Sequence, residues 1–247
     1  MDMKKALFVL MSALIGALFI GCSSTKVINI ADLSPVAIVN VAANQTLPYY
    51  SDETREDEYG DDEGVLTVTV NKFLAKENPE FLTRLDRVDY ADEVLAKSLV
   101  EIAGCEVVDK DKVIDSDTYK SLGNSPLALL DTRCRAIDYK VFYDINGKKA
   151  RLLEKEIGAK SLVLLEFKFN KMLMKGSKLG GKLGARAEMN AKVYDDKGKL
   201  IINNDYLSTS FDTIEISKLN YDREALVELF PPLIENLINQ FVLDCVN

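Results

Sequence analysis

Histidine and tryptophan are absent from the 247 residues of this sequence. Histidine is the usual general base of Ser and Cys hydrolases and the commonest protein ligand of zinc. Its absence therefore argues against both groups of enzymes. Basic residues are also in the minority, with 31 Lys and Arg against 39 Asp and Glu and a net charge of −8. A surface of that sign argues against nucleic acid or anionic lipid headgroups as the main partner.

Cysteine is scarce, and the four that are present show no spacing typical of a metal site. The chain is long enough to form its own hydrophobic core, so it needs no disulfide framework. Beyond Cys22 the cysteines are Cys105, Cys134 and Cys245. They are compatible either with one disulfide in an oxidising compartment or with three buried free thiols.

The amino terminus has the layout of a secretory signal. Lys4 and Lys5 form a short positive region, and the almost unbroken apolar run Ala6–Ile20 follows it. At about 15 residues this run is short of the roughly 20 that a membrane-spanning helix needs. We therefore predict a signal peptide over residues 1–21 that is cleaved from the mature protein, in preference to a permanent transmembrane helix.

The end of this signal, Phe19-Ile20-Gly21-Cys22, resembles the lipobox of bacterial lipoproteins, with Phe19 where leucine is usual. In that family the cysteine thiol is diacylated and the signal is cut before it. The resemblance implies that Cys22 is the lipidated first residue of the mature chain. Two or three acyl chains would hold the protein on a membrane without a spanning helix. The implied location is the cell envelope, on the outer membrane rather than the inner one.

The mature chain is predicted to form a lipidated tether over residues 22–34 and a single domain over residues 35–247. Loss of Lys4, Lys5 and Asp2 with the signal leaves 29 basic and 38 acidic residues, a net charge of about −9. Residues 44–64 break the apolar pattern and include eight carboxylates between Asp52 and Glu63. This segment is predicted to be an exposed acidic loop.

The first half of the domain is predicted to alternate strands with helices. The β-branched run Pro35–Val41 predicts a buried strand, and Val65–Val70 predicts a half-buried one. Helical spacing from Val88 to Ala103, closed by Gly104, predicts a helix. Shorter signals predict a strand at Glu106–Asp109, a helix from Ser125-Pro126 to Val141, and a helix over Ala150–Ile157 closed by Gly158.

The second half is predicted to be mainly antiparallel. Ser161–Phe169 is a strongly apolar strand, and Glu188–Tyr194 forms a hairpin with Leu200–Ser210 across Asp195-Asp196-Lys197-Gly198. Leu226–Leu243 predicts a final helix interrupted at Pro231-Pro232. The expected fold class is α/β (α+β): a single mixed sheet packed with helices, with a long antiparallel hairpin in the second half and a C-terminal helix.

Four stretches resemble the small α/β domain shared by curli-assembly lipoproteins, penicillin-binding-protein activator lipoproteins and the TolB amino-terminal domain. They are Pro35–Val39, Leu99–Asp109 (LVEIAGCEVVD), Ile157–Val163 and Ala187–Leu200 (AEMNAKVYDDKGKL). The resemblance implies an envelope lipoprotein built on that domain. The acidic loop is longer than the family pattern, and extra helix is inserted between Leu122 and Lys155. These departures put pore formation and synthase activation in doubt.

Several motifs suggest a binding site but have a simpler structural interpretation. Gly176–Leu183 (GSKLGGKL) fits G-x-x-x-x-G-K, yet Leu183 stands where a P-loop has a Mg²⁺-binding hydroxyl, and a strand follows instead of a helix. We interpret it as a mobile glycine-rich hairpin tip.

Acidic residues outside that motif also lack the pattern of a functional site. In the acidic loop, Asp57 occupies the position of the glycine in an EF-hand, which favours solvated surface over a Ca²⁺ site. Asp109, Asp111, Asp115 and Asp117 are interpreted as flexible surface rather than acid/base catalysts. The apolar stripe of the last helix is interpreted as core rather than a docking face.

These observations predict a protein with no catalytic residues, no cofactor and no metal. The function that fits best is a membrane-anchored, non-enzymatic scaffold or accessory component that docks on a protein partner or assembles with itself. The alternative is a lipoprotein that carries or senses a small ligand or lipid in a pocket between sheet and helices.

Overall fold

The structure, a computed structural model, describes residues 29–50, 78–123, 133–140, 142 and 144–246. These residues form one six-stranded sheet in which the order β2-β1-β3-β4-β5 is continuous and β6 also pairs with β4. The pair β1/β3 is parallel and every other pair is antiparallel. The strands are β1 (Val36–Ala43), β2 (Cys134–Arg135), β3 (Ser161–Ser177), β4 (Gly180–Asp195), β5 (Leu200–Thr209) and β6 (Ile214–Ser217). The predicted fold class is confirmed.

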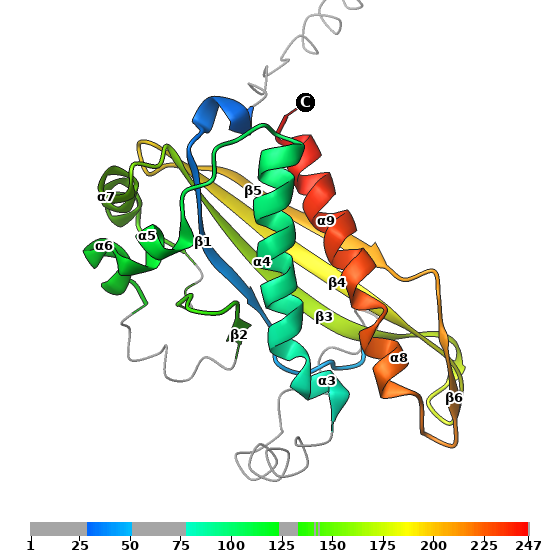
Figure 1. The fold of residues 1–247 in the computed structure, drawn as a ribbon. Helices are drawn as coiled ribbons and strands as arrows, with labels where there is room; N and C mark the ends of the chain where they lie inside the picture. The colour runs from blue at the N-terminus through cyan, green and yellow to red at the C-terminus, as the bar shows by residue number, and fades with distance from the viewer. Residues whose placement is uncertain (1–28, 51–77, 124–132, 141, 143, 247) are drawn as a thin grey trace, which may run out of the picture.

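Two long helices, α4 (Arg84–Glu101) and α9 (Phe230–Asp244), cover one face of this sheet (Figure 1). The apolar positions of α9 face the sheet: Phe230 packs edge-on against Phe169 of β3, and Phe241 packs against Tyr206 of β5. Burial of each such side chain contributes roughly 1.5–3 kcal/mol. The main core therefore lies between this face and the two helices, as the apolar stripe of the last helix predicted.

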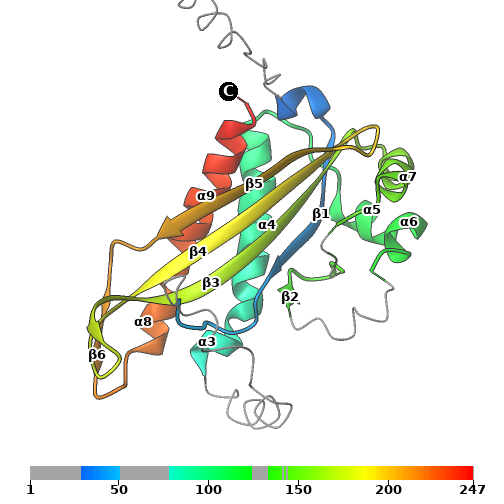
Figure 2. The same ribbon diagram turned by 180° about the vertical axis from the view of Figure 1, so that it is seen from behind.

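Among the described helices, none lies in front of the opposite face of β3, β4 and β5 (Figure 2). Because side chains alternate along a strand, β4 directs Ala187, Met189 and Ala191 into the core and its intervening residues to this open face. Those residues are Arg186, Glu188, Asn190 and Lys192, and all are partly exposed. The sheet is therefore two-sided, with one apolar face and one polar face.

The helices α5 (Lys110–Asp115), α6 (Asp117–Lys120) and α7 (Gly147–Ile157) form a group on the β1 side of the sheet, with α7 beside the turn between β4 and β5 (Figure 2). Tyr119 of α6 anchors this group because its hydroxyl donates to the carbonyl of Val39 at 3.0 Å. Three further short elements complete the described chain: η1 (Ile30–Leu33), α3 (Pro79–Leu82) and α8 (Arg223–Val227).

Glycines follow α4 and α7 and close the β4–β5 turn at the positions that the sequence predicted. Gly104 follows α4 with φ of 67°, and Gly158 follows α7 with φ of 74°. Gly198 closes the turn between β4 and β5 with φ of 69°. Each is a left-handed conformation that a residue with a Cβ adopts only with strain.

The helix predicted from Ser125-Pro126 to Val141 is wrong in its described part. Residues 124–132 and 141 lie outside the described residues, but Cys134 and Arg135 form β2, opposite Ala43 and Ala42 of β1. Such a helix would place Ile137 on its apolar face, whereas the side chain of Ile137 is 65% exposed. Hydrogen bonding to the outer edge of β1 outweighed the local helical pattern.

Three other predictions need smaller corrections. Glu106–Asp109 forms an isolated bridge between Val107 and Val36 in place of a strand. The acidic stretch Asp109–Asp117 was predicted to be flexible surface, yet it contains α5 and the start of α6, with Val113 fully buried. The break in the terminal helix precedes Phe230, so Pro231 and Pro232 lie in the first turn of α9, where proline is tolerated. The predicted strand Val65–Val70 lies outside the described residues.

Candidate partner-binding edge

The sequence-predicted lipidation site, Cys22, lies outside the described residues and stays a prediction. The acidic segment Asp52–Glu63 also lies outside them. In the P-loop-like stretch, Lys182 belongs to β4 and pairs with Glu215 of β6 at 3.6 Å between two exposed side chains. A strand in place of a helix N-terminus offers no phosphate site, which agrees with the interpretation of this stretch as a hairpin tip.

The remaining acidic and sulfur-containing candidates have structural roles. Asp109 caps α5 by accepting the amide of Asp111, and Asp115 pairs with Lys120 at 3.2 Å. Cys105, Cys134 and Cys245 are buried free thiols, so the disulfide alternative is wrong for them. Across the described ranges, no group of three or more Cys, Asp or Glu side chains could hold a metal ion. Within the same ranges, no helix is long and apolar enough to cross a bilayer.

A feature that the sequence analysis missed is the outer edge of β5. The strand pairs with β4 along its length, and no other described strand pairs with its outer side. Monomeric proteins usually protect such edges with proline or with charged side chains, lysine above all. The sequence of β5, LIINNDYLST, contains a single charged residue, Asp205, and no proline. The backbone groups along this edge are therefore available to pair with another strand.

The register of β5 determines which backbone groups point outward. The Ser210 amide donates to the carbonyl of Ala185 on β4 at 2.9 Å. Because the direction of these bonds alternates along an antiparallel strand, the backbone groups of Ser208, Tyr206 and Asn204 also point toward β4. Those of Asn203, Asp205 and Leu207 then point away from the sheet, where a partner strand would bind.

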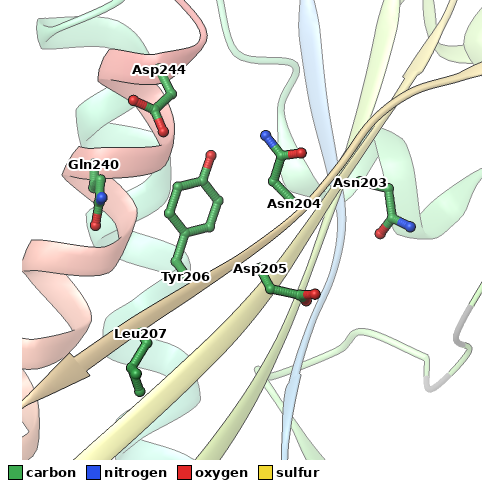
Figure 3. A pocket seen from close by; sticks show the side chains of 7 residues that line it. All are labelled: Asn203, Asn204, Asp205, Tyr206, Leu207, Gln240 and Asp244. Carbon is green, nitrogen blue, oxygen red and sulfur yellow. The ribbon is translucent and has the colours of Figure 1, made fainter.

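The side chains at this edge separate onto two sides of the sheet (Figure 3). Asn204 and Tyr206 are directed toward α9, whereas Asn203 and Asp205 are on the open face. On that open face, the amide nitrogen of Asn190 donates to both Asn203 Oδ1 at 3.0 Å and Asp205 Oδ1 at 2.8 Å. One β4 residue thus fixes the orientation of both β5 side chains.

A hollow of about 390 Å³ lies between β5 and the C-terminal half of α9. It is lined by Asn203, Asn204, Asp205, Tyr206, Leu207, Gln240 and Asp244. Five of these residues are consecutive in β5, so the hollow follows the free edge of the strand. Of the lining residues, only Leu207 is aliphatic, and a polar hollow of this kind suits hydrogen-bonding groups better than an acyl chain.

Tyr206 is the most buried residue of the hollow, at 7% exposed. Its ring packs on Phe241, and its hydroxyl is buried without a hydrogen bond, although it points between Asn204 and Asp244 (Figure 3). Burial raises the pKa of Tyr206 to about 12, with Asn204 lowering it and Asp244 raising it. The hydroxyl is therefore protonated at physiological pH and lies within reach of the side chains of Asn204 and Asp244.

Two apolar side chains extend from the same region of the chain. Leu207 is 51% exposed, and Phe211, just beyond the end of β5, is fully exposed. Isolated apolar residues are common on protein surfaces, but beside a strand edge that has no described partner they provide contact area for another protein.

A second polar cluster joins α3 to the sheet and is structural. Lys171 of β3 contacts Glu80 at 3.1 Å and donates to the hydroxyl of Tyr221 at 2.8 Å; that hydroxyl in turn donates to Glu80. Glu80 is buried, and burial lowers the pKa of Lys171 while Glu80 opposes that shift. Each charge has a partner, so the cluster holds elements together and leaves no group free for a ligand.

Comparison with known proteins adds little to this geometry. No family model matches the chain, and a search of curated proteins found no relative. Among solved structures, the C-terminal domain of LpoB from Salmonella enterica is similar over 70% of this chain and 80% of that chain, at 12% identity and a TM-score of 0.26. At that TM-score and identity, the match shows neither a family nor a function for this chain.

Proposed function

We propose that this protein is a lipid-anchored envelope protein without catalytic activity that docks on a protein partner through the outer edge of β5. The observation that carries the proposal is this ten-residue strand, whose outward backbone groups have no described partner and whose single charged residue is Asp205. Strand addition at such an edge is a common mode of protein recognition, because main-chain hydrogen bonds supply much of the affinity.

The place where the tether joins the domain also favours this function. The amide of Ile30 donates to the carbonyl of Cys245 at 2.8 Å, so the described chain begins beside the end of α9 and next to Asp244 of the hollow. The seven residues from Cys22 to Ile28 extend at most about 25 Å. An anchor at Cys22, on the outer membrane in our proposal, would keep this end of the domain close to the bilayer and to partners there.

Carriage of a small ligand or lipid has weaker support. The hollow beside β5 is open and mostly polar. A lipid carrier needs an enclosed apolar cavity, which this hollow does not provide. Protein docking also explains the exposed Leu207, which ligand carriage does not.

Site-specific photo-cross-linking in intact cells tests the proposed docking. A photoreactive amino acid at Leu207 should yield a discrete cross-linked protein adduct. Leu152 of α7 is the matched control, because it is a similarly exposed leucine (48%) on the far side of the domain. Equal labelling from both positions, or no adduct from Leu207, would contradict docking at this edge.

A further inference from the structure

We propose that β5 pairs in antiparallel fashion with β5 of a second copy of this chain, about a two-fold axis that passes beside Asn204. This inference names the partner of the β5 edge and so rests on the function proposed above. The result would be one continuous sheet through two protomers, with an isologous interface in which each copy presents the same strand.

The geometry of β5 restricts the registers that such a pair can have. A two-fold axis perpendicular to the sheet keeps each side chain on its own face, so residues on the open face must pair with residues on the open face. The axis therefore passes beside a residue rather than between two. With Asn204 on the axis, Asn203 faces Asp205 of the second copy, and both have backbone groups that point outward, as a hydrogen-bonded pair requires.

The side chains match in this register. Asn204 faces Asn204, the amide of Asn203 faces the carboxylate of Asp205, and Ile202 faces Tyr206. Leu207 then lies near the apolar start of the second strand, Leu200–Ile202, where the register of β5 shifts. Apolar residues thus meet largely apolar ones, and no charge meets a charge of the same sign, which is what cross-strand pairs need for stability.

In the neighbouring registers, the side chains that face each other do not match in polarity or charge. An axis at Asp205 would place the two Asp205 carboxylates opposite each other, which is destabilising. An axis at Asn203 would place Asn204 opposite Ile202, and one at Tyr206 would place Asp205 opposite Leu207. The polarity of the strand therefore selects Asn204 as the centre.

The contacts within each protomer prepare the two polar residues for this pairing. Asn190 occupies Oδ1 of both Asn203 and Asp205. This orientation leaves the donor nitrogen of Asn203 and the second acceptor oxygen of Asp205 for groups outside the protomer. Across the two-fold axis that donor and that acceptor face each other twice.

Disulfide trapping of the full chain in its native membrane tests this pairing. At the axis, a pair without backbone hydrogen bonds has its Cα atoms about 4.5 Å apart, within the range that a disulfide bridges. Mild oxidation of Asn204→Cys should therefore give mostly a disulfide-linked dimer of this chain. Asn203→Cys is the matched control, because its copies would lie diagonally at about 7–8 Å and should form several-fold less dimer.

The wild-type chain measures the background from its own cysteines, of which Cys105, Cys134 and Cys245 are buried. A mixture of Asn203→Cys and Asp205→Cys chains should give a mixed dimer, because these residues face each other. No dimer from Asn204→Cys, or equal dimer from Asn204→Cys and Asn203→Cys, would overturn the pairing. A heterologous adduct from Leu207 with no Asn204→Cys dimer would overturn it while leaving the proposed docking intact, whereas absence of both products would overturn both.

Discussion

Glu154 of α7 shows how far one residue can depart from its usual environment. The side chain is 2% exposed, and neither carboxyl oxygen has a hydrogen-bond partner. Burial, reinforced by Asp195 and Asp196, raises the pKa of Glu154 to about 8. The folded protein therefore favours the neutral acid, because a buried carboxylate without a partner is costly.

This pKa predicts a loss of stability in alkaline solution. A carboxyl whose pKa is higher in the folded than in the unfolded state contributes stability at low pH. That contribution is lost as pH rises from about 4.5 to about 8, at no more than about 1.4 kcal/mol per pH unit. Glu154→Gln keeps the shape of the neutral acid but cannot ionise. It should match the wild type near pH 4.5 and be more stable than it at pH 8.5, as measured by urea denaturation.

An exposed glutamate of α4 provides the control, because Glu101→Gln should keep the wild-type pH dependence. If Glu154→Gln lost stability with pH as steeply as the wild type, the assignment of this dependence to Glu154 would be wrong. The sequence alone did not indicate this residue. In KKARLLEKEI, Glu154 is one of two glutamates among lysines, and only its burial in the folded protein separates it from its exposed neighbour Glu156.

Among the helices and strands, the sequence predicted the ones that have strong local signals. The strand β1, the helix α4 and the hairpin β4–β5 were predicted from apolar periodicity and from glycines with positive φ. The strand β2 was not, because it exists only through pairing with β1 over two residues. The short helices α5 and α6 were also missed, since each depends on one buried residue, Val113 or Tyr119, among charged neighbours.

The turn between β4 and β5 makes a prediction at this scale. A Cβ on Gly198 would lie 2.0 Å from the carbonyl oxygen of Gly147, where α7 begins. A Cβ on Gly104 would meet nothing within 4 Å, although its φ is almost the same. Gly104→Ala should cost about 1–2 kcal/mol from its left-handed conformation. Gly198→Ala should cost at least about 1 kcal/mol more, because overpacking adds to the same strain.

Chemical denaturation of the two variants under one set of conditions measures this difference. Equal free energies of unfolding would mean that α7 and the β4–β5 turn do not pack backbone against backbone, as the structure has them.

At the scale of the whole molecule, the candidate site depended on topology that local patterns do not contain. The sequence predicted β5 as the second strand of a hairpin but could not show that no other described strand pairs with its outer side. A usable signal was present: β5 is the last long strand before the terminal helix, and it contains no lysine or proline. Cys22, by contrast, was predicted from a local motif, but it lies outside the described residues.

The lipid anchor gives a prediction for the whole chain in the cell. Cys22→Ser removes the thiol that would be acylated, so the protein should leave the membrane fraction and the detergent-rich phase. A conservative change next to it, Ser23→Thr, should leave the distribution unchanged. Retention of the Cys22→Ser variant in the membrane fraction, measured by immunoblot after detergent partitioning, would contradict lipid anchoring at this residue.

Hydrogen exchange along β5, in the full chain in its native membrane, tests the central claim most directly. Because β4 binds the amides of Asn204 and Tyr206, these amides should be protected in any folded state. If the edge is occupied, the amides of Asn203, Asp205 and Leu207 should be protected as well. Leu207→Lys, which introduces a protective edge charge, should release them, whereas Leu152→Lys should not. Rapid exchange of Asn203, Asp205 and Leu207 in the wild type, beside protected Asn204 and Tyr206, would contradict docking through β5.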